Sequence, residues 1–426
     1  MLTVGLVAAL AIGAAWGMAG RYSDLLAKNR VLQAPPPCQS DPACLRYREF
    51  FIADAHSDTL LHRDPAEPSV RGHVDLSRLL RGGINLQVFA MAPVAPRMQA
   101  QDGEVCGSRE AANRIAQLFA VNEPLRPSTW ISDEARVRRM MDRFDAAMVS
   151  RPSAPGRFIP IRDAADAARL LSARERGEAV VGALLSVEGF YWASPDRDEL
   201  QRQLQEMQRR GVRMIGLTQR ASGPLAGSSE DCGDRGGLTE AGRFAVREIW
   251  RQGMVLDLAH ASPAAIADVA EMAKGGALGA VVVSHTGLQR ACDRDRNLSD
   301  ADARNVARAG GVIGLGYWRY VACWSPDDSP SEIRRKLVES FVALHDILDD
   351  PDFRAEMGPD YSPMAHIGLG SDFDGGTTMP FDTTGIPWLL AGLAAAERDG
   401  RRIFEDADIE RIAGGNYLRL LESALE

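Results

Sequence analysis

The chain has 426 residues, 45% of them hydrophobic and 25% charged, so it can bury a large core as one barrel with insertions or as two domains. The formal net charge of −9 and the pI near 5.4 argue against nucleic acid as a partner, because a phosphate-binding surface needs concentrated Lys and Arg. No stretch has the spacing of a Gly-rich phosphate-binding loop.

The first 20 residues contain no charge and are rich in Ala, Gly, Leu and Val, which is typical of a signal peptide or a short membrane anchor. The first positive charge is Arg21, so the positive-inside rule alone would keep the main domain in the cytoplasm. The short apolar length and the small-residue sequence 17–19 favour an export signal instead. We therefore expect a periplasmic or otherwise extracytoplasmic protein, either released or tethered to the inner membrane. The alternative is a buried helix of the domain.

Residues 21–44 are expected to form a linker, because three consecutive prolines at 35–37 forbid a helix and stiffen the chain. The folded domain is expected over residues 45–426. Within it, eight apolar segments have the composition of buried strands. They are residues 49–56, 84–91, 179–189, 212–218, 254–260, 280–287, 311–317 and 366–375.

Helical patterns separate these segments, for example at residues 240–251, 263–274 and 331–348. Apolar strands that alternate with helices pair in parallel, and eight of them predict closure into a (β/α)8 TIM barrel. A doubly wound open sheet is the alternative. Residues 92–178 hold more helix than one crossover needs, so we expect an insertion after strand 2 that lies over the barrel mouth.

Candidate metal ligands and a catalytic carboxylate stand where predicted strands end. In chain order they are His56, Asp58, Glu188, His260, His285 and Asp372. Three of the seven histidines are among them, and we interpret the other four as solvated or packing residues. The carboxyl ends of the strands form the face on which (β/α)8 barrels build their active sites. The sequence therefore predicts a metal centre at the barrel mouth.

Imidazole nitrogens and carboxylate oxygens are ligands that zinc accepts, and one carboxylate can span two ions. Two ions a few ångströms apart lower the pKa of a shared water and supply hydroxide near neutral pH. Asp372 can then take the proton of that water and pass it to a leaving amine. The alternative is that some of these residues only support the ligands.

The segments DAHSDT, SVEG, DLAHAS, VVSHTG and GSDFDG, with GGNYLRLLE at 414–422, resemble the membrane dipeptidase (renal dipeptidase) family, the M19 metallopeptidases. The resemblance extends in order from about residue 48 to the end of the chain. It implies a (β/α)8 barrel with two Zn²⁺ ions that hydrolyses dipeptides. It further implies that His56 and Asp58 hold one zinc, that His260 and His285 hold the other, and that Glu188 bridges them.

The resemblance also implies that Asp372 is the general acid and base and that Arg296 binds the substrate carboxylate, which a guanidinium can hold through two N–H groups. Arg294 is the nearby alternative. One position departs from the family, because Gln219 stands where a His stabilises the tetrahedral intermediate. Glutamine can donate a neutral hydrogen bond to an oxyanion but cannot carry positive charge. The adjacent Arg220 carries a positive charge, but side chains alternate along an extended chain, which would aim Arg220 away from the site.

The sequence thus predicts an exported binuclear zinc dipeptidase that cleaves a dipeptide or similar small amide with metal-activated hydroxide. Its expected catalytic residues are Asp372, Glu188 and Gln219. The alternative is a dipeptidase-like, metal-binding accessory protein with little peptidase activity, for example in periplasmic pyoverdine-type siderophore maturation. The resemblance also implies a homodimer, and residues 1–20 leave membrane anchoring open.

The six cysteines fit an oxidising compartment, with free buried thiols as the alternative. Cys292 and Cys323 follow neighbouring predicted strands, so their Cα atoms are expected within the disulfide range of about 4.4–6.8 Å. The resemblance to mammalian family members also implies a disulfide at Cys292. Cys38 and Cys44 are close in sequence. Cys106 and Cys232 would then pair and tie the insertion to the loop that carries Gln219.

Overall fold

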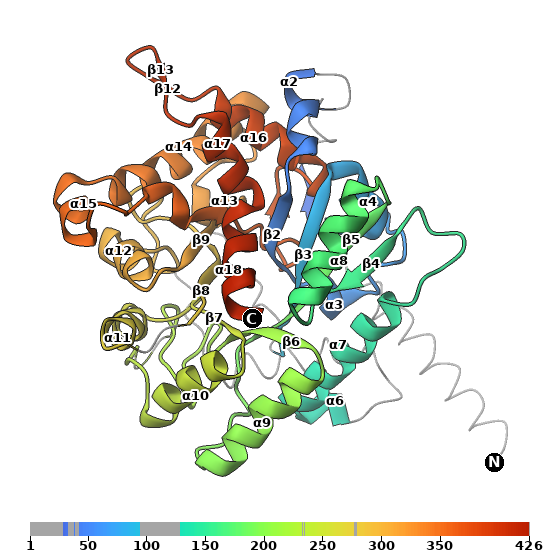
Figure 1. Ribbon diagram of the computed structural model, residues 1–426, viewed down its shortest axis with the longest axis vertical. Coiled ribbons are helices and arrows are strands. Elements are labelled where there is room, and N and C mark those ends of the chain that lie inside the picture. Colours follow the sequence, from blue (N-terminus) through green and yellow to red (C-terminus); the bar gives the residue numbers. More distant parts are fainter. Residues whose placement is uncertain are drawn as a thin grey trace.

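Eight parallel strands form the centre of the computed structural model, which describes residues 29–32, 38, 42–93, 128–231, 233, 235–276 and 279–425. Each strand pairs with its neighbour in chain order (Figure 1). The strands are β2 (Ile52–Ser57), β3 (Ile84–Met91), β5 (Val180–Glu188), β6 (Val212–Gly216), β7 (Val255–Asp257), β8 (Val281–Thr286), β9 (Val312–Leu315) and β10 (Ile367–Leu369). All eight lie at the predicted segments.

The two outer strands of this sheet, β2 and β10, meet and nearly close a barrel. Ser57 and Phe373 form an isolated parallel bridge, and the backbone N–H of Asp58 donates to the carbonyl of Phe373 at 2.8 Å. An open doubly wound sheet keeps its outer strands apart. The predicted (β/α)8 fold is therefore confirmed.

Helices surround the barrel, and most of them begin at a polar residue whose side chain accepts a backbone N–H of the first turn. Ser299 and Ser329 form complete capping boxes with Asp302 and Glu332. The longer helices are α4 (Leu76–Gly82), α7 (Asp133–Ala147), α8 (Ala164–Glu175), α9 (Arg197–Arg209), α10 (Glu240–Arg251), α11 (Pro263–Lys274), α12 (Asp300–Arg308), α14 (Pro330–Leu348), α15 (Pro351–Met357), α16 (Ile386–Ala394) and α18 (Asn416–Leu425). The short ones are α2 (Pro42–Leu45), α3 (Thr59–His62), α6 (Ser128–Ile131), α13 (Arg319–Ala322) and α17 (Asp406–Glu410).

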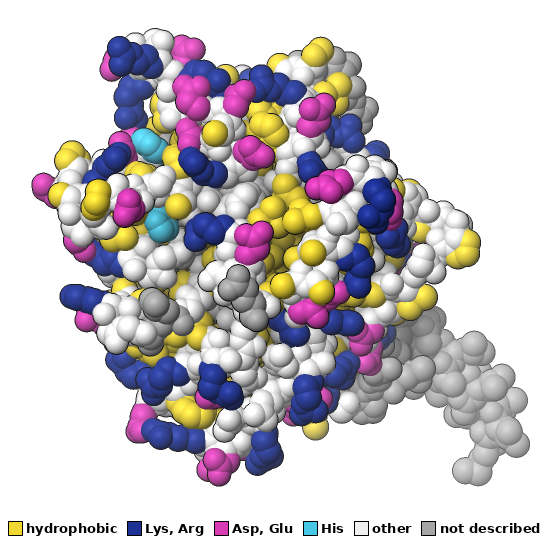
Figure 2. Space-filling view, viewed as in Figure 1, with side chains coloured by type: hydrophobic (Ala, Val, Ile, Leu, Met, Phe, Trp, Pro, Cys, Tyr) yellow, Lys and Arg dark blue, Asp and Glu magenta, His cyan; other side chains and the backbone are white. Residues whose placement is uncertain are grey.

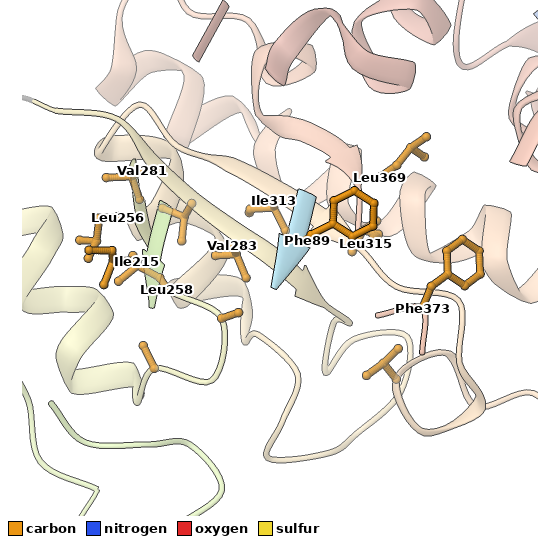
Figure 3. Close-up of a cluster of buried hydrophobic side chains, with 14 of the residues drawn as sticks. Phe89, Ile215, Leu256, Leu258, Val281, Val283, Ile313, Leu315, Leu369 and Phe373 are labelled. Carbon is orange, nitrogen blue, oxygen red and sulfur yellow. The ribbon is translucent and has the colours of Figure 1, made fainter. Parts of the chain in front are cut away.

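Successive residues of a barrel strand enter two different hydrophobic clusters, as the alternation of side chains along a strand requires. Ile215 belongs to the cluster between the strands and the helices, whereas its neighbour Met214 belongs to the cluster inside the barrel. Figure 3 shows part of the first cluster, to which β3 and β6 to β10 all contribute. Tyr417 of α18 joins the inner cluster, and its hydroxyl donates to the carbonyl of Leu369 at 2.8 Å.

The insertion after the second barrel strand is present, but its described part belongs to the barrel wall. Phe144 of α7 packs against Phe89 of β3 with ring centroids 6.3 Å apart. The extra strand β4 (Arg157–Pro160) pairs with Val180–Ala183, the amino-terminal part of β5, which is the end away from the predicted site. Strand β4 therefore does not cover the mouth, whereas Arg143 of α7 donates to the carbonyls of Leu60 and Leu61, just after β2, at 2.8 Å. Residues 94–127 lie outside the described part.

A short segment of the expected linker pairs with the main domain. The strand β1 (Arg30–Val31) lies parallel to β11 (Thr378–Met379), and Asn29 Oδ1 accepts the backbone N–H of Gly376 at 2.9 Å. The chain before the domain is thus bound beside the loop that follows β10. Residues 1–20 lie outside the described part; within that part, no helix has the length and apolarity to cross a membrane.

Two disulfides stand among the described cysteines. Cys292 and Cys323 are bonded with Cα atoms 5.4 Å apart, as predicted, and Cys38 is bonded to Cys44. Both bonds indicate an oxidising, extracytoplasmic compartment. The predicted pairing of Cys106 with Cys232 lies outside the described residues.

Charged side chains of both signs are interleaved over the face shown in Figure 2. Ion pairs such as Arg308 with Glu356 and Arg398 with Asp346 link neighbouring elements. Exposed pairs of this kind contribute little to folding, about 0–1 kcal/mol each. The stability of the barrel therefore comes mainly from its two hydrophobic clusters.

His366, before β10, is expected to make folding sensitive to acid. Burial lowers its pKa from 6.5 to about 4, and its Nδ1 lies 2.7 Å from the carbonyl of Gly311. Below pH 6.5 His366 binds a proton in the unfolded chain but not in the folded chain, so the free energy of unfolding falls as the pH drops from 6.5 to 4. Because one pKa unit corresponds to about 1.4 kcal/mol, the loss is roughly 3 kcal/mol.

The substitution His366→Asn keeps a donor near Nδ1 and removes the titration. We expect the difference in unfolding free energy between the variant and the parent, measured by urea unfolding, to shift in favour of the variant between pH 7 and pH 4.5. A difference that stays constant over this range would show that His366 does not titrate as described.

Candidate metal centre

The predicted ligands converge at the carboxyl ends of β2, β5, β7 and β8. The strand pairing is irregular between Asp54 and Ser57 in β2 and between Val283 and Thr286 in β8. His56 and His285 lie within these two stretches. Such irregularities re-aim side chains and are common beside active sites. The sequence located these residues at strand ends, and the barrel brings them together.

Glu188 is the centre of the cluster. Its Oε2 lies 3.9 Å from His56 Nε2, while its Oε1 lies 2.9 Å from His260 Nε2 and 3.5 Å from His285 Nε2. His56 Nε2 is in turn 3.8 Å from Asp58 Oδ1. The two oxygens of this carboxylate thus face different imidazoles, as a bridging ligand must.

Buried polar atoms without hydrogen-bond partners indicate that these residues can bind metal ions. His56 Nε2 and Asp58 Oδ1 are buried without a hydrogen-bond partner, and buried polar atoms rarely remain unpaired. Ligand atoms of His56, Glu188 and His285 lie within 4.8 Å of one another, as do those of His56, Asp58 and Asp372. The donor set of imidazole and carboxylate suits zinc and related divalent ions.

Hydrogen bonds to the outer ring nitrogens orient the three imidazoles. Ser284 Oγ lies 2.9 Å from His285 Nδ1 and 3.3 Å from His56 Nδ1, and Glu230 Oε2 lies 2.5 Å from His260 Nδ1. A carboxylate accepts, so His260 Nδ1 donates to Glu230, which leaves Nε2 as the nitrogen that would bind an ion. His56 and His285 place Nδ1 beside Ser284 in the same way and leave Nε2 facing the centre.

The cluster gathers several buried carboxyl groups that perturb the titration of their neighbours. Burial would raise the pKa of Glu188, but His56 and His260 lower it to about 2. Burial would lower the pKa of His56, but Glu188 and Asp58 raise it to about 10. Burial, together with Asp58 and Glu188, raises the pKa of Asp372 well above its ordinary value. Cations bound here would relieve the repulsion among these carboxylates.

Two of the site residues have a left-handed backbone. His260 has φ 63° and Asp372 has φ 58°, a conformation that costs a non-glycine residue about 1–3 kcal/mol and clusters at functional sites. Asp374, with φ 63°, holds the loop after β10 in place: it accepts from Thr59 Oγ1 and from the backbone N–H of His73 at 2.8 and 2.7 Å. Asp372 is thereby set beside His56 and Asp58.

Gln219 points into the cluster. Its Nε2 donates to Glu188 Oε2 at 3.2 Å, and its Oε1 is buried without a partner. The backbone N–H of Gln219 donates to the hydroxyl of Tyr191 at 2.8 Å. The side chain therefore contacts the central carboxylate directly, which the sequence did not predict.

The two arginines proposed for substrate binding differ in their surroundings. Arg296 is 4% exposed, and its Nη2 donates to the carbonyl of His285 at 2.8 Å, while its Nε lies 3.4 Å from Glu230 Oε2. Arg294 is exposed and stacks on Tyr320, 5.2 Å from the ring centroid. Arg296 is thus the one at the cluster, and it also supports His285.

Glu230 and Asp374 are site residues that sequence reasoning missed. Asp374 follows Asp372 by two residues, in the same GSDFDG segment, so its proximity was a usable signal. Glu230 lies in the irregular connection between β6 and α10, where periodicity carries no information.

Comparisons with known proteins show the family of this chain. The sequence profile of the family described as Membrane dipeptidase (Peptidase family M19) matches residues 46–426. A curated relative, the dipeptidase verJ of Clonostachys rogersoniana, is 28% identical over 251 residues, which are 58% of this chain and 56% of that protein. The alignment thus spans little more than half of that relative.

Two crystal structures share the fold. One is a metallo peptidase from Rhodobacter sphaeroides liganded with a phosphinate mimic of the dipeptide L-Ala-D-Ala, with 22% identity and a TM-score of 0.61, covering 88% of this chain and 99% of that one. The other is the probable dipeptidase PvdM from Pseudomonas aeruginosa, with 18% identity and a TM-score of 0.63, covering 92% and 99%. Since the family profile matches residues 46–426, which include the whole barrel, this chain belongs to the membrane dipeptidase family, peptidase family M19.

Proposed function

We propose that this protein is an exported hydrolase that uses two zinc ions to cleave a dipeptide or a similarly small amide. The observation that carries this proposal is the position of Glu188, whose Oε2 faces His56 and whose Oε1 faces His260 and His285. A carboxylate whose two oxygens face different imidazoles suits a centre of two ions better than a centre of one.

In this proposal His56 and Asp58 would hold one ion, His260 and His285 would hold the other, and Glu188 would be a ligand shared by both. Two ions at this place would lower the pKa of a water molecule and polarise the amide carbonyl. The side chains of His56, Asp58 and Glu188 are buried, and charges act more strongly there than in water.

The chain's own side chains supply the proton transfer and the orientation. Asp372, whose pKa burial raises, can take a proton at its carboxylate and return it to the leaving amine. Gln219 Nε2 is the donor beside the bridging carboxylate. Arg296 uses three of its donor nitrogens on His285, Thr286 and Glu230; a guanidinium has five N–H groups, so others stay available to a substrate carboxylate.

The location and the partners form part of the proposal. The two disulfides and the uncharged segment 1–20 support export to the periplasm, as a released protein or as one tethered to the inner membrane. The proposal also includes a homodimer, a small peptide or amide as ligand, and the absence of nucleic-acid partners.

A second candidate function is that of a metal-binding accessory protein with little peptidase activity, for example in pyoverdine-type siderophore maturation. Gln219 favours it, because the neutral amide points at Glu188 and cannot supply the positive charge of a histidine. A screen of dipeptides of both stereochemistries separates the two candidates. Rapid turnover of any dipeptide would exclude the second.

Metal analysis tests the proposed centre. Gently purified protein should contain about two zinc ions per chain, and removal of the metal by a chelator should lower the melting temperature, because ions that bind the folded state stabilise it. Fewer than about one zinc per chain would contradict a binuclear centre.

Gly375 offers a way to displace Asp372 without changing a charged residue. A Cβ at Gly375 would collide with Asp372 Oδ1 and lie 3.0 Å from Asp58 Oδ2. We expect Gly375→Ala to fold and to lower kcat by at least about tenfold, since catalytic groups moved by about 1 Å can lose 10²-fold in rate. Gly275→Ala, where the nearest atom is 3.4 Å away, is the control. Equal kcat values in both variants and the parent would contradict a catalytic role for Asp372.

Gln219→His tests the departure from the family. A histidine can carry a positive charge near the developing oxyanion, so we expect dipeptide hydrolysis to rise by about 10-fold or more, equivalent to roughly 1.4 kcal/mol of transition-state stabilisation. An unchanged or lower rate, with metal content preserved, would mean that Gln219 already serves the substrate of this protein.

A further inference from the structure

Glu230 joins two parts of the site through a single carboxylate oxygen. Its Oε2 lies 2.5 Å from His260 Nδ1 and 3.4 Å from Arg296 Nε. The side chain is 13% exposed. Glu230 therefore lies between a proposed metal ligand and the proposed receptor of the substrate carboxylate.

Backbone pairing fixes Glu230 beside His260. The N–H of Ser229 donates to the carbonyl of His260 at 2.9 Å, and Ser228 forms an isolated bridge with Ala261. The backbone N–H of Glu230 donates to Ser228 Oγ at 3.2 Å, and that hydroxyl donates to the carbonyl of Gln219. The loop is thus connected by hydrogen bonds to His260 on one side and to Gln219 on the other.

Each contact of Glu230 has a separate chemical effect. As acceptor of the Nδ1 proton, Glu230 selects the tautomer of His260 that directs the Nε2 lone pair to the centre, and it makes the ring a stronger ligand. As partner of Arg296 Nε, it orients the guanidinium. Loss of the negative charge would weaken the first effect and free the arginine to rotate.

We propose that Glu230 is a positioning residue that couples the strength of metal binding on the His260 side to the recognition of the substrate's carboxylate by Arg296. This inference rests on the proposed function, in which His260 holds an ion and Arg296 holds the substrate. It assigns to this chain a preference for substrates with a free terminal carboxylate that depends on Glu230.

The test uses Glu230→Gln, which keeps the size of the side chain and removes its charge. Zinc affinity, measured by competition with a chelator on protein first stripped of metal, should fall about 10- to 100-fold for the more weakly bound ion. In addition, KM for a hydrolysed dipeptide should rise at least about 5-fold more than KM for the same dipeptide with a C-terminal amide, because only the free carboxylate needs an oriented Arg296.

Asp231→Asn is the matched control. Asp231 lies in the same loop and accepts the backbone N–H groups of Ser222 and Gly233, and its substitution should leave zinc affinity unchanged. Glu230→Asp retains the charge and should recover part of the affinity; it also replaces the Gln variant if that protein does not fold.

The outcomes separate this inference from the proposed function. If the parent protein binds no zinc, the proposed function fails and this inference fails with it. If the parent binds two ions and Glu230→Gln binds them equally well, only the role of Glu230 is wrong. A loss of zinc affinity without the change in KM ratio would overturn the coupling and leave Glu230 acting on His260 alone.

Discussion

The structure depends on the burial of several carboxylates around Glu188. Besides burial, Glu188 raises the pKa of Asp58, and Asp58 and Glu188 raise that of Asp372, while the nearby His56 is driven strongly toward its protonated form. Burying so much negative charge is costly unless cations or donors compensate it. The histidines, Gln219 and Arg296 supply part of that compensation, and divalent ions would supply the rest.

The barrel accommodates this arrangement because the strained backbone conformations lie only at its rim. The strands below the site alternate between two hydrophobic clusters, while the positive-φ residues His260, Asp372 and Asp374 all follow strand ends. Hydrogen bonds to Asp374 and to the carbonyl of His260 hold these unfavourable conformations. A rigid wall and a strained, well-anchored rim are what a preorganised site requires.

The course of the barrel could be predicted because hydrophobic segments and strand ends are local signals. All eight strands lie where apolar runs predicted them, and topology alone then gathers His56, Glu188, His260 and His285 at one end. Contacts made by loops could not be predicted in the same way: Glu230 lies in an irregular connection, and the docking of residues 29–32 beside β11 involves too few residues to show a periodic pattern. The expected cover over the mouth is wrong for β4, which joins the foot of β5, because the sequence pattern gives no direction in space.

Gln219 is the residue on which the two proposed functions differ. Membership in the M19 family follows from the match over residues 46–426, and Gln219 Nε2 is a neutral donor to Glu188. The fold and the ligand positions are compatible with either proposed function, and the difference between them lies in the chemistry of one side chain.

The most direct measurement is an anomalous difference map at the zinc absorption edge from crystals of the purified protein. The proposed centre predicts two peaks about 3.5–4 Å apart, one beside His56 and Asp58, the other beside His260 and His285, with the carboxylate of Glu188 between them. A single peak, or no peak near Glu188, would contradict the central claim.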